Sequence, residues 1–291
     1  MCKLVKCGKS CYFFCMVTGT SDLFVRYLLG SEKNTDLLVD FINAVLADSG
    51  FEMIKKATIT NPFNLKDYSI DKETILDVKA VSETNKTFDV EIQNHPENSY
   101  VKRSLYYWSQ LYSSQLDKGS AYRELQPVIC INLLSHSMFK TIKKGHSCFL
   151  LTEKENKESI LTDDLQINYL ELPKFGDTYN IKSRLSLWAW FFRFEGVAEK
   201  EEEMEFLLKQ DPVMEKAHNV YTTFTEDSRL RELSEARQKR LKDEASRLDS
   251  ARQEGLEQGK LETARQFKIM GVSVDIISKA TGLSLEEIEK L

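Results

Sequence analysis

The chain lacks three features that would point to common classes of protein. No apolar run reaches the ~18 to 20 residues that a membrane-spanning helix needs, so we expect no membrane partner. The net charge is −5, which argues against a protein that grips nucleic acid over its whole surface and leaves only a local contact through a patch or a bound metal. The cysteines near the N-terminus show no paired CxxC or Cys/His spacing, which argues against a zinc site. What the chain has is enough apolar sequence, 42% of 291 residues, for one α/β core with an appendage.

Two short segments that alternate apolar and polar residues, 75–81 and 88–93, predict an antiparallel hairpin. Side chains alternate faces along a strand, and the stretch 82–87 between the segments is polar and turn-prone. One face of the hairpin is apolar, and the other carries carboxylates, an amide and an amine. The apolar face comprises Leu76, Val78, Ala80, Phe88, Val90 and Ile92, and the polar face comprises Asp77, Lys79, Asp89, Glu91 and Gln93.

A hairpin centred near Thr84 sets Asp77 beside Glu91. Two carboxylates held side by side on a rigid sheet, with an amide or amine two residues on, form a site for a hard divalent cation such as Mg²⁺, which takes oxygen ligands. The alternative is the solvated outer face of an ordinary hairpin, where charged side chains are the default. The pattern alone leaves both interpretations open.

The rest of the chain up to residue 194 predicts a mixed sheet with helices on its faces. The predicted elements are helices at 22–29 and 35–46, a connector or edge strand at 52–62, the hairpin, a helix at 99–116, strands at 128–134, 147–151 and 167–172, and a helix at 185–194. Helical periodicity places two stripes toward the core. These are Leu37, Leu38, Phe41, Ile42 and Val45 in the second helix, and Val101, Leu105, Trp108, Tyr112 and Leu116 in the third.

Five stretches of this sequence agree in order and spacing with one known family. They are Ser21–Gly30, Ile75–Ala80, Phe88–Gln93, Arg103–Trp108 with Leu111, Tyr112 and Gly119, and Pro127–Asn132. In this order they resemble the Rpn family of recombination-promoting nucleases, the PD-(D/E)XK nuclease family transposases. The resemblance spans roughly residues 20 to 291, and its specificity comes from the motifs together rather than from any one of them.

The resemblance implies a restriction-endonuclease-like (PD-(D/E)XK) fold, an α/β core with a mixed sheet flanked by helices and followed by a long charged helical C-terminal tail. In that fold the acidic residue of the first hairpin strand and the Glu of the second bind Mg²⁺, which assigns Asp77 and Glu91 as ligands, with the backbone carbonyl of Ile92 as a third. Such a metal polarises a scissile phosphate and helps to convert water to hydroxide near neutral pH. Gln93 stands where the wider superfamily has Lys, and its amide can orient the attacking water but stabilises negative charge less than an ammonium does.

Asp22 matches the acidic residue that the family carries on its first helix. The match is looser here, because Ser21 and Val25 depart from the residues that the family usually has at those positions. An Asp at the start of a helix is also what N-capping and the helix dipole favour without any catalysis. Both roles stay open for Asp22.

Four residues are candidates for contacts with DNA phosphates. Lys79 lies on the same strand face as Asp77 and could supply the charge that Gln93 lacks, or it could be a solvated lysine. Arg103 and Tyr107 lie one turn apart on the helix after the hairpin, with Lys102 beside them, and an arginine there can hold a phosphate. A structural arginine and a half-buried tyrosine are the alternative.

The C-terminal part of the chain predicts a long exposed helix or a modest coiled coil, followed by a helix-turn-helix. Residues 226–268 carry eleven Lys or Arg against ten Asp or Glu, with a thin leucine stripe. In residues 274–291, Gly282 suits the turn, Ser284 the cap of the second helix and Glu287 the capping box. Three Glu and one Lys on that helix argue against DNA reading and favour a two-helix cap or a self-association element.

We therefore divide the chain into an N-terminal extension (1–19), a nuclease-like domain (20–222), a charged helix or coiled coil (223–270) and a small helix-turn-helix-like unit (271–291). The extension is either disordered or precedes a true start at Met16. Cys130 and Cys148 fall in apolar strand-like runs, and this cysteine usage is typical of reduced thiols, which predicts a cytoplasmic protein.

The sequence thus predicts a cytoplasmic, Mg²⁺-dependent DNA endonuclease that hydrolyses phosphodiester bonds and is linked to recombination or mobile DNA. We can place no DDE-type acidic triad. The expected partners are DNA and, through the C-terminal helices, further copies of the chain. The alternative is a catalytically weak nuclease fold retained as a DNA-binding or oligomerising regulator, and the presence of both Asp77 and Glu91 favours the enzyme.

Overall fold

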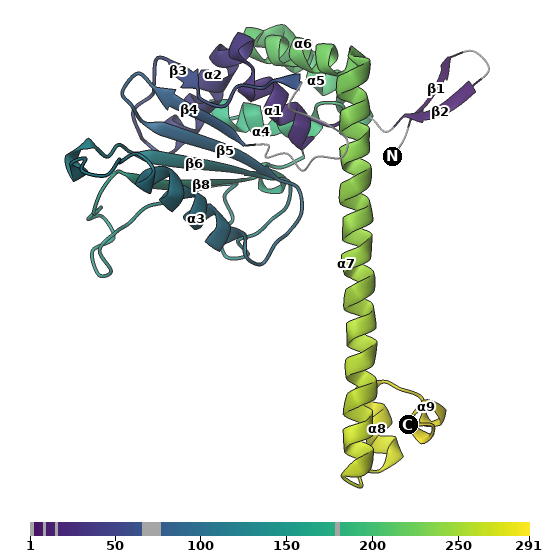
Figure 1. Ribbon diagram of the computed structural model, residues 1–291. Helices are drawn as coiled ribbons and strands as arrows, with labels where there is room; N and C mark the ends of the chain where they lie inside the picture. The colour runs from purple at the N-terminus through teal and green to yellow at the C-terminus, as the bar shows by residue number, and fades with distance from the viewer. Residues whose placement is uncertain (1–2, 8–9, 15–16, 66–76, 178–180) are drawn as a thin grey trace. The chain divides into compact units, whose positions relative to one another are not determined.

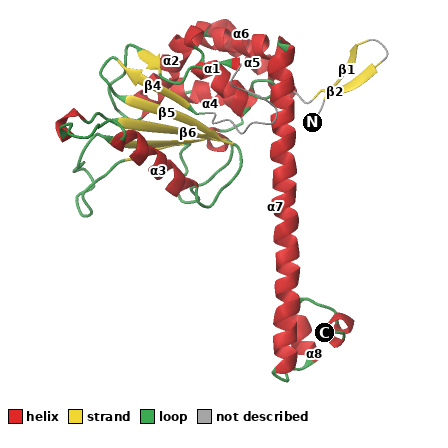
Figure 2. Ribbon diagram, viewed as in Figure 1, coloured by secondary structure: helices red, strands yellow, loops and turns green. Residues whose placement is uncertain are grey.

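The computed structural model describes residues 3–7, 10–14, 17–65, 77–177 and 181–291. The chain forms two compact units, Met1–Glu235 and Ala236–Leu291, which are treated separately below. Among the described residues, no helix has the length and apolar character needed to cross a membrane. Figure 2 shows a first unit of helices and strands and a second of helices alone.

A mixed six-stranded sheet lies at the centre of the first unit (Figure 1). Its strand order is β3-β4-β5-β6-β8-β7, with β5, β6 and β8 parallel and the other pairs antiparallel. Strands covered on both faces are mostly apolar, and every residue of β6 and β8 is buried, including the polar Asn132, Asn168 and Glu171. The bounds are β3 Ala57–Ile59, β4 Val78–Ser82, β5 Thr87–Gln93, β6 Val128–Leu134, β7 His146–Phe149 and β8 Leu165–Glu171.

Helices cover both faces of this sheet. One face carries α1 (Asp22–Gly30), α2 (Thr35–Asp48), α4 (Arg184–Phe194), α5 (Glu201–Gln210) and α6 (Pro212–Glu226), and the other carries α3 (Tyr100–Ser113). The alternating apolar residues of the hairpin, among them Val78, Ala80, Phe88 and Val90, are buried on the five-helix side. The predicted fold class is therefore confirmed. The helices α5 and α6 were not predicted from the sequence. Short 3-10 helices occupy Glu32–Asn34, Tyr122–Glu124, Leu172–Phe175 and Ala198–Lys200.

The predicted core face of α3 was right in the second half of the helix, where Trp108 and Tyr112 pack against the sheet, and wrong in the first half. Val101 and Leu105 are 40% and 44% exposed, whereas Tyr100 and Ser104 are buried against the sheet. The Ser104 hydroxyl lies 2.5 Å from the Tyr169 hydroxyl. A small polar residue such as Ser104 lets the helix approach the strands closely, and its hydroxyl can form a hydrogen bond with another buried hydroxyl. A prediction from hydrophobic periodicity does not place such a residue in the core.

At the N-terminus, β1 (Lys3–Cys7) and β2 (Ser10–Phe14) pair as an antiparallel hairpin. Met16, the alternative start, lies outside the described residues, as do Cys2, Cys15 and the segment 66–76 that contains Leu76. Cys130 is buried, and both it and Cys148 are free thiols.

The long charged helix predicted for the tail is present as α7 (Ser228–Ile269). Its first turns belong to the first unit, where Leu230 and Leu233 are buried in the main core. The predicted domain boundary at 222 falls inside α6, and the first compact unit runs on to Glu235.

In the second unit, α8 (Val274–Thr281) and α9 (Leu285–Glu289) pack against the end of α7 around Ala264, Ile277 and Ile288. Gly282 has a left-handed backbone, with φ 78°, and Ser284 forms a capping box with Glu287. These are the turn and cap that the sequence predicts.

Candidate active site

The β4–β5 hairpin has the register that the sequence predicts. Val78 pairs with Val90 and Lys79 with Asp89, and continuing this register by one residue brings Asp77 opposite Glu91. Asn61 fixes the start of β4, because its side-chain amide donates to the Asp77 carbonyl at 3.2 Å and its Oδ1 accepts from the Lys79 backbone at 2.7 Å. The backbone at Asp77 is therefore held by Asn61, next to the strand β5 that carries Glu91.

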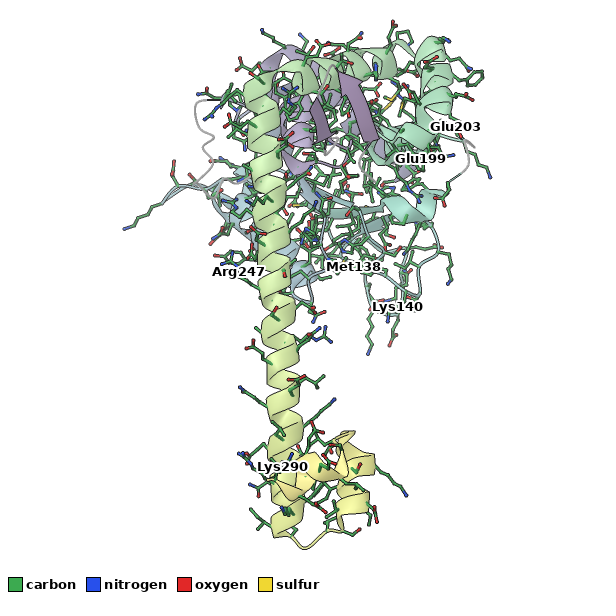
Figure 3. All side chains as sticks on the ribbon, turned by 90° about the vertical axis from the view of Figure 1, so that its right-hand side faces the viewer. Met138, Lys140, Glu199, Glu203, Arg247 and Lys290 are labelled. Atoms are coloured by element: carbon green, nitrogen blue, oxygen red, sulfur yellow. The ribbon has the colours of Figure 1, made fainter. Side chains whose placement is uncertain are left out.

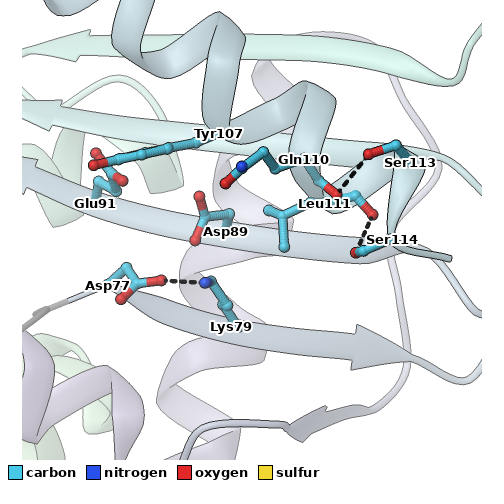
Figure 4. Close-up of a pocket in the computed structure, with 9 residues that line it drawn as sticks. All are labelled: Asp77, Lys79, Asp89, Glu91, Tyr107, Gln110, Leu111, Ser113 and Ser114. Atoms are coloured by element: carbon cyan, nitrogen blue, oxygen red, sulfur yellow. Dashed lines mark hydrogen bonds and ion pairs between the residues drawn. The ribbon is translucent and has the colours of Figure 1, made fainter.

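A cleft of about 520 Å³ lies between this hairpin and α3 (Figure 4). Its floor carries three carboxylates and one amine from β4, β5 and the residue just before β4, and its wall comes from α3. The lining residues are Asp77, Lys79, Asp89, Glu91, Tyr107, Gln110, Leu111, Ser113 and Ser114. The polar hairpin face thus opens into a cleft and is not a plain solvated surface.

Lys79 forms an ion pair with Asp77 at the cleft floor. Its Nζ lies 2.9 Å from Asp77 Oδ2, with the carboxylate 6% exposed and the lysine 37% exposed. Burial acts to lower the pKa of Lys79, but the hydrogen bond to Asp77 and the charges of Asp77, Asp89 and Glu91 outweigh it and raise the pKa overall. Lys79 is therefore a protonated ammonium in the cleft at neutral pH.

Asp89 lies between these charges and is 3% exposed. Its Oδ1 is buried and has no hydrogen-bond partner among the described residues. Burial, followed by the charges of Glu91 and Asp77, raises the pKa of Asp89 to about 8. Strand alternation already predicts Asp89 on the polar face, two residues before Glu91, but the pattern alone indicates no role for it.

Glu91 is positioned by a hydrogen-bonded group under α3. The buried Tyr100 hydroxyl shares its hydrogen between two acceptors, Asn132 Oδ1 at 2.8 Å and Glu91 Oε2 at 3.3 Å. Asn132 in turn donates to the Asn168 carbonyl at 3.0 Å. Burial raises the pKa of Glu91, and the charge of Arg103 opposes that shift. Tyr100 and Asn132 were not predicted from the sequence, since a tyrosine at the start of a helix and an asparagine inside an apolar strand match no motif.

Gln93 and Arg103 contact each other at the C-terminal end of β5. Arg103 donates to Gln93 Oε1 at 2.9 Å and to Glu97 Oε2 at 2.6 Å, and Gln93 Nε2 donates to the His95 carbonyl at 2.8 Å. Neither side chain lines the cleft. Of the other candidate phosphate contacts, Tyr107 lines the cleft and Lys102 is exposed on α3.

Asp22 is the first residue of α1, and its Oδ1 accepts a hydrogen bond from the Leu23 backbone at 2.8 Å. Ser21 occupies the cap position without a side-chain capping bond. Asp22 does not line the cleft, but Asn94 donates to the Thr20 carbonyl at 2.8 Å, which joins the start of α1 to the end of β5.

A family model described as PD-(D/E)XK nuclease family transposase matches residues 20–251. The chain belongs to this family. No curated protein and no solved structure matches this chain. PD-(D/E)XK nucleases generally use divalent metals, and membership supports a nuclease-like role linked to mobile DNA.

In this PD-(D/E)XK chain, no set of three or more His, Cys, Asp or Glu side chains converges on a metal position within the described ranges. Mg²⁺ does not need such a cage, because proteins usually bind it through one or two carboxylates plus waters and substrate phosphates. Asp77 and Glu91 offer two hard oxygen donors of that kind. The Gln93 carbonyl accepts from Ser135 on the β6 side at 3.2 Å, so by strand alternation the Ile92 carbonyl faces the β4 side, where Asp77 begins the hairpin.

Proposed function

We propose that this protein is a Mg²⁺-dependent DNA endonuclease that hydrolyses phosphodiester bonds during recombination or movement of DNA. The observation that carries the proposal is the cleft in which Asp77, Lys79 and Glu91 meet on one rigid hairpin of a PD-(D/E)XK family member. Burying several carboxylates close together costs free energy unless a cation or a proton neutralises their negative charge. A cleft that holds the buried carboxylates of Asp77 and Asp89, the partly buried carboxylate of Glu91 and one lysine is suited to a divalent cation.

Asp77 and Glu91 would hold the metal, with the Ile92 carbonyl as a further ligand. When bound, Mg²⁺ would polarise the scissile phosphate and lower the pKa of a coordinated water. The Lys79 ammonium faces the same space and can stabilise negative charge that develops on the phosphate. Tyr100 keeps the Glu91 carboxylate in one orientation, which a catalytic metal site requires of its ligands.

We further propose a cytoplasmic protein that self-associates through its C-terminal helices. The support is the solvent-exposed part of α7, where Leu248 and Leu256 are 66% and 61% exposed. A long charged helix with exposed leucines buries its apolar edge most readily against another copy.

A second candidate, a catalytically weak nuclease fold that binds DNA as a regulator, is favoured by one observation. Gln93 is committed to Arg103 and to the His95 backbone, and Lys79 is committed to Asp77. The two groups that could orient water and stabilise charge are thus both engaged by the protein itself.

Cleavage of supercoiled plasmid distinguishes the two candidates. The endonuclease should nick plasmid in Mg²⁺ and not in EDTA, and Asp77→Asn should be inactive while the matched exposed variant Asp163→Asn keeps wild-type activity. Gln93→Lys should keep or raise activity, because it places an ammonium where the wider superfamily has Lys and frees the Arg103 guanidinium that Gln93 now holds. Wild-type protein that binds DNA without nicking it at any Mg²⁺ concentration would favour the regulator.

A further inference from the structure

The irregular loop 135–145 connects β6 to β7 at the carboxyl ends of the parallel strands. It contains Lys140, Lys143 and Lys144 and no acidic residue. All three lysines are exposed, and none has an ion-pair partner within the part of the chain that the structure describes. Figure 3 shows Lys140 next to Met138. In a chain of net charge −5, this is a local basic patch.

A buried ion pair holds the backbone of this loop. Glu171 is fully buried, and its Oε1 accepts from the Met138 and Phe139 backbones at 2.5 and 3.0 Å. Lys174 lies 2.5 Å from Glu171 and donates to the Phe139 and Ile142 carbonyls, each at 2.7 Å. Burying two charges is costly unless their hydrogen bonds are satisfied. Here Glu171 and Lys174 both form hydrogen bonds with the loop backbone. These bonds fix the backbone from which the three lysines extend.

The loop lies on the sheet face that carries the cleft. Met138 and Phe139 pack against the cluster that contains Tyr100, the residue that contacts Glu91, and the Phe139 ring centre is 5.2 Å from that of Tyr169. The Ser135 backbone donates to the Gln93 carbonyl at 3.2 Å, which joins the start of the loop to the end of β5.

We propose that the loop 135–145 is a phosphate-backbone contact for duplex DNA, in which Lys140, Lys143 and Lys144 grip the strand outside the cleft. The inference rests on the proposed function and names how that function holds its substrate. Two of the candidate phosphate contacts, Lys79 and Arg103, are already paired with protein carboxylates. The loop lysines are not, so a phosphate can approach them without breaking an ion pair.

Equilibrium binding of the full chain to a fluorescent DNA duplex in EDTA, measured by anisotropy over a salt series, tests the proposal without any cleavage. Each phosphate contact contributes about 0.9 to the slope of log K against log salt. The triple variant Lys140→Gln/Lys143→Gln/Lys144→Gln should therefore bind more weakly, with a slope smaller by about 2 to 3. Replacement of the same three residues by Arg should restore the wild-type slope.

The matched control is Lys154→Gln/Lys157→Gln/Lys209→Gln, which removes the same charge from three other exposed positions. Its slope should stay near the wild-type value. An unchanged slope in the loop variant, an equal loss in both variants, or no binding of wild-type protein would each overturn the proposal. Nicking by wild-type protein in Mg²⁺ alongside an unchanged loop-variant slope would refute the loop contact while leaving the proposed function standing.

Discussion

Replacing Asp89 by Asn should stabilise the metal-free protein, and more so as the pH rises. In the folded chain Asp89 keeps its proton up to about pH 8, against an ordinary pKa of 3.8. Unfolding between these two values therefore releases a proton, so the free energy of unfolding falls with rising pH across that window. A shift of about 4 units corresponds to at most ~6 kcal/mol. The cleft is open to water, so we expect about half of this at pH 8.

Asn has the same shape and cannot ionise, so Asp89→Asn and wild type should have nearly equal stability at pH 4. Urea unfolding in EDTA, followed by tryptophan fluorescence, should show their difference growing from pH 4 to pH 8 in favour of the variant. The exposed control Asp163→Asn should show no such trend. A difference that is independent of pH, or a destabilised Asp89→Asn at pH 8, would show that Asp89 is not held as a buried acid among like charges.

Two further predictions concern the support of Glu91 and the extent of the catalytic unit. Tyr100→Phe removes a hydrogen bond that lowers the pKa of Glu91, so the acidic limb of the pH–rate profile for nicking should move to higher pH. The control Tyr112→Phe removes a hydroxyl that bonds to Asp164 instead and should leave the limb in place. An unmoved limb in Tyr100→Phe would contradict the positioning role of Tyr100. A chain ending at Glu235 should stay folded and nick plasmid in Mg²⁺, whereas one ending at Thr222 loses buried aromatic and leucine side chains of the main core and should be less stable by several kcal/mol. Equal thermal melting of the two truncations would show that the start of α7 adds nothing to the first unit.

The parts of the fold that follow from local pattern could be predicted from the sequence. The hairpin register followed from strict alternation around Thr84, and the cap at Ser284 followed from the capping-box spacing. The buried face in the first half of α3 could not be predicted, because Ser104 and Tyr100 are buried through hydrogen bonds of their hydroxyls to distant strands. Hydrophobic periodicity does not register such hydrogen bonds.

The sequence predicted that Asp77 and Glu91 lie side by side on the hairpin, but not the contacts that support them. Alternation brings Asp77, Asp89 and Glu91 to one face, and a chemist can infer a cation site from that. The engagement of Gln93 by Arg103 depends on how α3 docks over β5. The loop lysines become a defined surface only through Glu171, which lies more than twenty residues further along the chain.

The central claim is that the Glu91 carboxylate is part of a metal-dependent catalytic site. The most direct test is the initial rate of plasmid nicking in Mg²⁺ by Glu91→Gln, which keeps the size of the side chain and removes its charge. Since a catalytic metal stabilises the transition state by several kcal/mol, the rate should fall at least ~100-fold while circular dichroism shows an unchanged fold. A Glu91→Gln protein that nicks plasmid at the wild-type rate would contradict the claim.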